Sequence, residues 1–168
     1  LMELHLSILD GVGDRYDTPY FNNLKKYSQK PVGTFHALPV ARGKSVFRSH
    51  WIRDMGHVYG VNLFLAESSA TTGGLDSLLE PTGNIKRAQE MAARAFGADR
   101  AYFVTNGTST SNKIVLQALL APGDIVLIDR NCHKSHHYAM VLSGAQPLYL
   151  EAYPMTAYSM YGAVPLRS

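Results

Sequence analysis

The sequence predicts an α/β fold in which a partial parallel or mixed sheet carries helices on both faces. The first observation is that helix-like and strand-like segments alternate after residue 81, with short connections between them. This alternation is typical of βαβ units, whose right-handed crossovers build a parallel sheet. The second is that the 168 residues are 46% hydrophobic and 17% charged, which is typical of a globular chain that buries a core.

Each element is assigned from the spacing of apolar residues and from the Gly and Pro residues that interrupt it. The clearest case is an amphipathic helix that ends before Gly97. Helices are expected over residues 85–96, 113–120 and 133–142. Short β-prone or apolar runs predict strands over residues 101–105, 124–129 and 146–150.

The first part of the chain is less regular. Residues 1–30 are interpreted as a lead-in that contains a short helix over residues 19–27, with Pro19 at its first position. The pattern over residues 35–74 is irregular, with Gly, Ser and Thr crowded at residues 68–74, and its strands cannot be assigned.

Charge and composition exclude several classes of function. The net charge is only +3, and Lys and Arg are scattered singly, so a nucleic-acid partner is not expected. The apolar runs fall far short of the ~20 residues that span a bilayer, so no membrane role is expected. Cys132 is the single cysteine, which rules out an intrachain disulfide and favours a reducing cytoplasm.

The segment 106–112 is the first candidate site, because it leaves an expected strand and opens a helix. Ligands of parallel sheets bind at the carboxyl ends of the strands, and unpaired amides at a helix start attract anions. Gly107 allows a close turn, and Thr108 and Ser109 can offer amide and hydroxyl donors to a phosphate. Ordinary helix capping by Ser and Thr explains the same residues, and this alternative stays open.

A second phosphate motif is a weaker candidate. The triplet from Gly43 through Lys44 to Ser45 matches the tail of a nucleotide-binding P-loop, but Leu38 occupies the position of the required glycine. We therefore expect a solvated loop at this place.

His133 follows the next expected strand, which places it near the phosphate turn if the two strands are neighbours. There it could stack on an aromatic cofactor. A metal site competes, since His133 and His137 are four residues apart and Cys132 is adjacent, but no acidic partner accompanies them. Lys134 should point about 100° away from His133 and be solvated, and Cys132 is expected to be inert packing.

Residues 102–113 (YFVTNGTSTSNK) and 129–135 (DRNCHKS) together resemble the ornithine/lysine/arginine decarboxylase family. The resemblance extends back through residues 75–83 (LDSLLEPTG) and forward through 147–150 and 162–165. The first third of the chain matches more loosely.

This resemblance implies a large pyridoxal-phosphate domain of the aspartate-aminotransferase type, built as a dimer with shared active sites. It implies that Gly107, Thr108 and Ser109 bind the phosphate of pyridoxal 5'-phosphate (PLP) and that His133 stacks on its ring. It further implies a small amino-acid substrate, ornithine, lysine or arginine, from which carbon dioxide and an amine are released. No metal is implied.

The family's Schiff-base lysine and the aspartate that pairs with the pyridinium nitrogen lie beyond the matched positions. The 168-residue chain is therefore expected to be a piece of a longer enzyme and to be inactive alone. Residues 1–74 would form the lead-in and irregular segment, and residues 75–168 the first part of the PLP-binding large domain. Two alternatives remain: another PLP enzyme of the same fold, such as an aminotransferase or lyase, and a non-catalytic anion-binding or assembly module.

Overall fold

The computed structural model of the chain describes residues 1–68 and 75–166. The chain forms two compact units, Leu1–Phe103 and Val104–Ser168. No described helix is both long and apolar enough to cross a membrane. The crowded stretch at residues 68–74 lies, apart from Ser68, outside the described residues, and the domain boundary expected after residue 74 stays a prediction.

The first unit begins with a helix that we expected only as a lead-in. Helix α1 spans Met2–Arg15 and buries none of its residues. Gly11 and Gly13 each cost the helix only about 1 kcal/mol relative to Ala, and the residues before them are mostly good helix formers. This helix was not predicted from the sequence.

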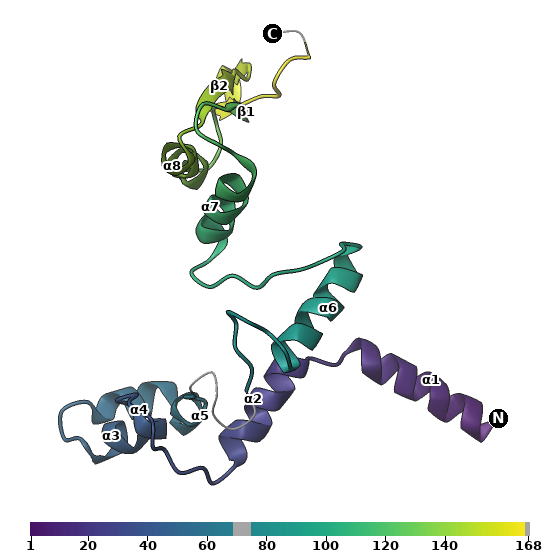
Figure 1. The fold of residues 1–168 in the computed structure, drawn as a ribbon, viewed down its shortest axis with the longest axis vertical. Coiled ribbons are helices and arrows are strands. Elements are labelled where there is room, and N and C mark those ends of the chain that lie inside the picture. The colour runs from purple at the N-terminus through teal and green to yellow at the C-terminus, as the bar shows by residue number, and fades with distance from the viewer. Residues whose placement is uncertain (69–74, 167–168) are drawn as a thin grey trace. The chain divides into compact units, whose positions relative to one another are not determined.

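Helix α2, Pro19–Gln29, packs against α6, Asn84–Phe96 (Figure 1). Both helices were predicted, within two residues at each end. Tyr27 of α2 and Ile85 of α6 are both buried within the unit. An ion pair of 2.9 Å between Arg87 of α6 and Asp17 joins α6 to the start of α2.

The middle of the unit, where no element could be assigned, consists of short helices. These are the 3-10 helix η1, Ala41–Gly43, and the α-helices α3, Lys44–Arg48, α4, Arg53–Tyr59, and α5, Val61–Leu65 (Figure 1). Phe47 and Phe64 meet edge to face at 5.8 Å between ring centroids, within a small apolar cluster. Helices of this length are stabilised by packing rather than by their own propensity, which is why periodicity did not reveal them.

Arg42 holds this cluster to the end of α2. Its side chain is 6% exposed, and its guanidinium donates to five backbone carbonyls. The acceptors are those of Tyr27, Ser28, Lys30, Val32 and Leu65. Its own amide donates to the carboxylate of Glu67 at 2.7 Å. A buried charge with all these partners satisfies backbone groups that would otherwise be left unpaired.

The expectation of a solvated loop at the P-loop-like triplet was wrong. Gly43 is buried and precedes α3, and a Cβ at this position would lie 2.9 Å from the ring of Phe47. The glycine is thus explained by close packing. No strand leads into it among the described residues, as a P-loop would require.

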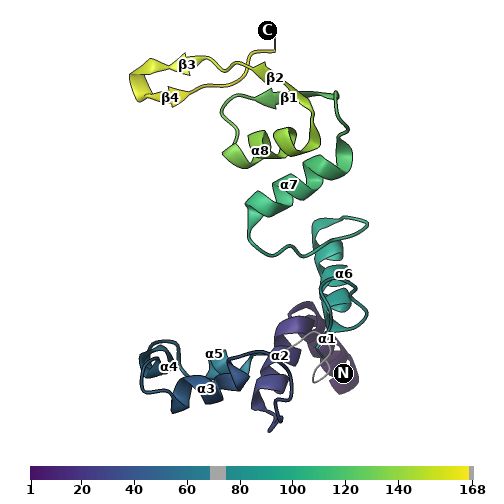
Figure 2. The ribbon, with the colours of Figure 1, turned by 60° about the vertical axis from the view of Figure 1, so that its left-hand side comes forward.

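The second unit has the α/β architecture predicted. Helix α7, Thr108–Leu119, is followed by β1, Ile125–Asp129, α8, Lys134–Ser143, and β2, Gln146–Leu150. The strands pair in parallel, with Leu127 opposite Leu148, and α7 packs against α8 (Figures 1 and 2). A small antiparallel hairpin follows, formed by β3, Pro154–Met155, and β4, Met160–Tyr161, with the 3-10 helix η2, Thr156–Tyr158, between them (Figure 2).

Two sequence-based expectations needed correction here. Residues 101–105 are not a strand, because no described strand pairs with them and β-prone residues need a partner to form a ladder. Helix α7 begins at Thr108, five residues earlier than expected, because the polar residues assigned to the turn form its first turns. On β1, Ile125 and Leu127 are 71% and 64% exposed, which leaves an apolar strip on one face of the strand.

Candidate functional site

Two successive residues before α7 have positive φ angles. Asn106 has a φ of 67° and Gly107 a φ of 78° with a ψ of −179°. Asn tolerates the left-handed region, whereas the second conformation belongs almost entirely to glycine. The amide of Thr110 closes the turn by donating to the carbonyl of Gly107 at 3.0 Å. The chain therefore turns sharply at Asn106 and Gly107, and helix α7 begins at Thr108.

The donors of this helix start are free to meet an anion. Among the described residues, the amides of Thr108 and Ser109 have no backbone acceptor, and α7 carries no side-chain cap. The positive end of the helix dipole lies at the same place. Capping was the alternative explanation for the Ser and Thr residues here, and among the described residues the N-cap Gly107 makes no side-chain cap to α7.

His133 lies at the start of the next helix, as expected. It is the N-cap of α8, and its Nδ1 accepts a hydrogen bond of 3.2 Å from the amide of Ser135. The same Nδ1 lies 2.9 Å from the Oγ of Ser135. Ser135 is 2% exposed, and its Oγ also accepts a hydrogen bond of 2.9 Å from the Nδ2 of Asn112 on α7.

Ser109 and His133, which are 24 positions apart, border one hollow of about 200 Å³. The residues that line it are Ser109, Lys113, His133, Lys134, Ser135 and Tyr138. This set contains two cationic side chains and no carboxylate, so the hollow suits an anion. Gly107 and Thr108 do not line it. Lys134 is exposed as expected. It also borders the same hollow as His133, although we expected its side chain to point away from that residue.

Cys132 and His137, which suggested a metal, form a different arrangement. The Sγ of Cys132 lies 3.4 Å from the Nε2 of His137, and the Nδ1 of that ring lies 3.0 Å from the hydroxyl of Tyr149 on β2. Burial, followed by the nearby charge of Asp129, raises the pKa of the Cys132 thiol. Among the described residues, no three His, Cys, Asp or Glu side chains are grouped to hold a metal ion.

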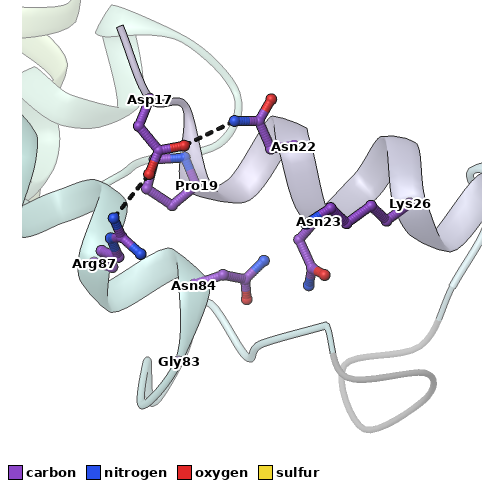
Figure 3. Close-up of a pocket in the computed structure, with 8 residues that line it drawn as sticks. All are labelled: Asp17, Pro19, Asn22, Asn23, Lys26, Gly83, Asn84 and Arg87. Carbon is purple, nitrogen blue, oxygen red and sulfur yellow. Dashed lines mark hydrogen bonds and ion pairs between the residues drawn. The ribbon is translucent and has the colours of Figure 1, made fainter. Parts of the chain in front are cut away.

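A second hollow, of about 390 Å³, lies between α2 and α6 in the first unit. Figure 3 shows Asp17 bridging Asn22 and Arg87, with the side chain of Asn84 near the hollow. Both polar atoms of the Asn84 side chain are buried without a hydrogen-bond partner among the described residues. Asp17 offsets Arg87 here, and Lys26 also lines this hollow, so its side chains carry one net positive charge, compared with two at the hollow beside Ser109.

Sequence reasoning missed Asn112, Lys113 and Tyr138 as neighbours of the candidate site, and it did not single out Ser135. Asn112 and Ser135 stand inside the two motifs quoted above, but their meaning depends on the packing of α7 against α8. A parallel βαβ unit with an open helix start and a histidine at one cationic hollow is an arrangement typical of α/β proteins that bind a phosphate group.

Comparison with known proteins identifies the family. Residues 18–168 match the Orn/Lys/Arg decarboxylase, major domain, family, and the chain belongs to it. It is 43% identical over 136 residues to the constitutive ornithine decarboxylase of Escherichia coli K12, covering 80% of this chain and 19% of that protein. The lysine decarboxylase LdcA of Pseudomonas aeruginosa is 39% identical over 133 residues, covering 79% of this chain and 18% of that protein.

Solved structures agree. The constitutive lysine decarboxylase of E. coli superposes with a TM-score of 0.82 at 35% identity, over 94% of this chain and 22% of that one. The Francisella novicida lysine decarboxylase LdcF gives a TM-score of 0.83 at 34% identity, and the match covers 96% of this chain and 22% of that one. The chain thus spans about a fifth of the length of these relatives.

Proposed function

We propose that the intact protein is a PLP-dependent decarboxylase that acts on a basic amino acid, ornithine, lysine or arginine, and releases carbon dioxide and an amine. Family membership supports the reaction class, since relatives are named for each of these three substrates. The observation that carries the proposal is that Ser109 at the start of α7 and His133 at the start of α8 border one cationic hollow.

The residues present fit the cofactor. A phosphate needs several donors and positive potential, and the free amides of Thr108 and Ser109 at the start of α7 supply both. A Cβ added at Gly107 would meet no atom within 4 Å apart from its chain neighbours, so the backbone is open on the side where a phosphate would approach. An aromatic ring needs a flat partner, and the exposed imidazole of His133 offers one.

When bound, PLP supplies an aldehyde that joins to the substrate amine and a ring that takes up the electron pair left by carbon dioxide. The chain's own residues would bind and orient. Thr108 and Ser109 would hold the phosphate by amide and hydroxyl hydrogen bonds, and Gly107 would allow its close approach. His133 would limit the tilt of the ring by stacking on one face. Orientation of this kind is a large part of what an enzyme contributes.

We also propose that the intact enzyme is a homo-oligomer, a dimer or larger, that works in the cytoplasm. Ile125, Leu127 and Leu148 on the parallel strands are more than half exposed in this chain, which supports further contacts across this surface. The single cysteine supports a reducing compartment.

The experiment is an assay of the intact protein with PLP and, separately, ornithine, lysine and arginine. Carbon dioxide release from at least one of them, with the matching amine, is the expected result. A Thr108→Ala/Ser109→Ala double variant should raise the PLP concentration needed for half activity about tenfold or more, because two hydroxyl donors to a charged group are lost. Release of a keto acid without carbon dioxide would indicate an aminotransferase, and binding of PLP without turnover would indicate a non-catalytic module.

A further inference from the structure

Three residues from two helices form a continuous hydrogen-bonded chain that ends on the imidazole of His133. Asn112 of α7 donates from Nδ2 to the Oγ of Ser135 at 2.9 Å, and that Oγ lies 2.9 Å from the Nδ1 of His133. The amide nitrogen of an Asn can only donate, so the serine oxygen acts as the acceptor there. Its single proton is therefore available to the imidazole.

This arrangement selects one form of the ring. Nδ1 already accepts the amide proton of Ser135 at 3.2 Å, so it has its lone pair, and not a proton, on this side. In the neutral ring the proton consequently lies on Nε2. The hydrogen bond made by one ring nitrogen decides what the other presents, which here leaves Nε2–H and the ring face for a bound group.

The supporting groups are rigidly held. Ser135 is 2% exposed, and Ala139, one turn further along α8, is fully buried. Asn112 is half-buried on α7, which packs against α8. A buried hydroxyl with two partners has little freedom to rotate, so the imidazole that it contacts is restrained as well.

We propose that Asn112 and Ser135 are positioning residues, which fix the tautomer and the plane of His133 for stacking on PLP. This inference rests on the proposed function and adds two residues to it. In this role, neither the side-chain amide of Asn112 nor the hydroxyl of Ser135 needs to contact the cofactor. They act through His133, as the partners that orient a metal-binding or catalytic histidine do.

The test compares two exchanges of an amide for a carboxylate on α7 of the intact protein. Asn112→Asp keeps the shape but replaces the donor by an acceptor, so the hydroxyl of Ser135 turns away from His133. Gln117→Glu is the matched control, because Gln117 is exposed and donates only to the carbonyl of Lys113 in its own helix, at 3.2 Å. Each apoprotein is titrated with PLP, and the visible circular dichroism of the bound cofactor and the melting temperature are recorded.

Asn112→Asp is expected to raise the Kd for PLP about five- to tenfold and to reduce the dichroism per bound cofactor, while Gln117→Glu changes neither. Ser135→Ala serves as a second variant, since Ala suits a helix and leaves no new buried charge. It should change both readings in the same direction. A purely structural link between the helices would lower the melting temperature and leave the dichroism per bound cofactor as in the wild type.

Unchanged affinity and dichroism in both Asn112→Asp and Ser135→Ala would overturn the positioning role and leave the proposed function standing. Failure of the wild-type protein to bind PLP at all would overturn both proposals.

Discussion

The carboxylate of Asp76 accepts a hydrogen bond of 2.7 Å from the amide of Gly83, seven residues further along the chain. The amides of Ser77, Thr82, Ile85 and Lys86 donate to the same carboxylate. The carboxylate therefore closes the loop before α6 and caps the start of that helix. The hydrogen bonds and the helix dipole both stabilise the ionised form of the Asp76 carboxylate.

Replacing Asp76 by Ala should lower the free energy of unfolding by about 1–2 kcal/mol, because the amides at the start of α6 lose their acceptor. Urea unfolding followed by circular dichroism measures this difference. Asp10→Ala, at an exposed position of α1, is the control and should change the free energy by less than about 0.5 kcal/mol. Equal effects of the two substitutions would contradict the capping role.

The hydrogen bonds of the Asp76 carboxylate should make the free energy of unfolding depend on pH. Burial acts to raise the pKa of Asp76, but the hydrogen bonds from the backbone of Thr82, Gly83, Lys86 and Ser77 outweigh it and lower the pKa from 3.8 to about 2. A depressed pKa in the folded state gives stability that is complete above 3.8 and is lost as the pH falls toward 2. Asp76→Asn should lack this component. The stability difference between wild type and variant should therefore shrink as the pH falls through this window, and a constant difference would argue against it.

Arg42→Lys should destabilise the first unit by about 3 kcal/mol. Lysine offers three donors from one point, whereas the guanidinium of Arg42 reaches five carbonyls, so several buried acceptors would be left unpaired. Thermal unfolding measures the loss. Arg48→Lys, at the exposed end of α3, keeps the charge and is expected to have almost no effect. A similar melting temperature for both variants would show that the carbonyl contacts of Arg42 contribute little.

Gly107→Ala should weaken PLP binding about tenfold, although no atom stands in the way of the new methyl group. The reason is conformational: with a φ of 78° and a ψ of −179°, an L-residue at this position is strained by about 1–3 kcal/mol, so the turn shifts away from the phosphate. Fluorescence titration with PLP measures the change. Gly11→Ala within α1 is the control, which should leave binding unchanged and slightly stabilise that helix.

His133→Ala should weaken retention of PLP and depress turnover, whereas His137→Ala should mainly reduce stability, by about 1 kcal/mol. His137 contacts Tyr149 and Cys132 and does not line the hollow. His136→Ala serves as a further comparison, because the Nδ1 of His136 only contacts the carbonyl of His133. PLP absorbance after gel filtration gives retention. Equal harm from all three substitutions, together with loss of activity in a chelator, would favour a metal site instead.

Local patterns in the sequence predict much of the second unit. The strand β1 and the helix α8 begin within one residue of their expected starts, and β2 has the expected bounds, since short apolar runs there alternate with clear turn residues. Gly144, at a φ of 73°, ends α8 in the left-handed conformation that a helix-terminating glycine adopts. The two motifs also led to Ser109 and His133, which the fold brings to one hollow.

Local sequence patterns do not predict which residues far apart in the sequence contact each other. Residues 101–105 have strand-forming side chains, yet no neighbouring strand among the described residues pairs with them. Arg42 looks like an ordinary surface residue until five carbonyls from Tyr27 through Leu65 surround it. Asn112 and Ser135 are 23 positions apart, and only the packing of α7 on α8 makes them neighbours. Sequence thus determined most elements of the second unit and the chemical types at the site, through short-range preferences of the backbone. Tertiary structure decided which polar groups are paired, because burial makes each unpaired group costly and the available partners depend on how the helices pack.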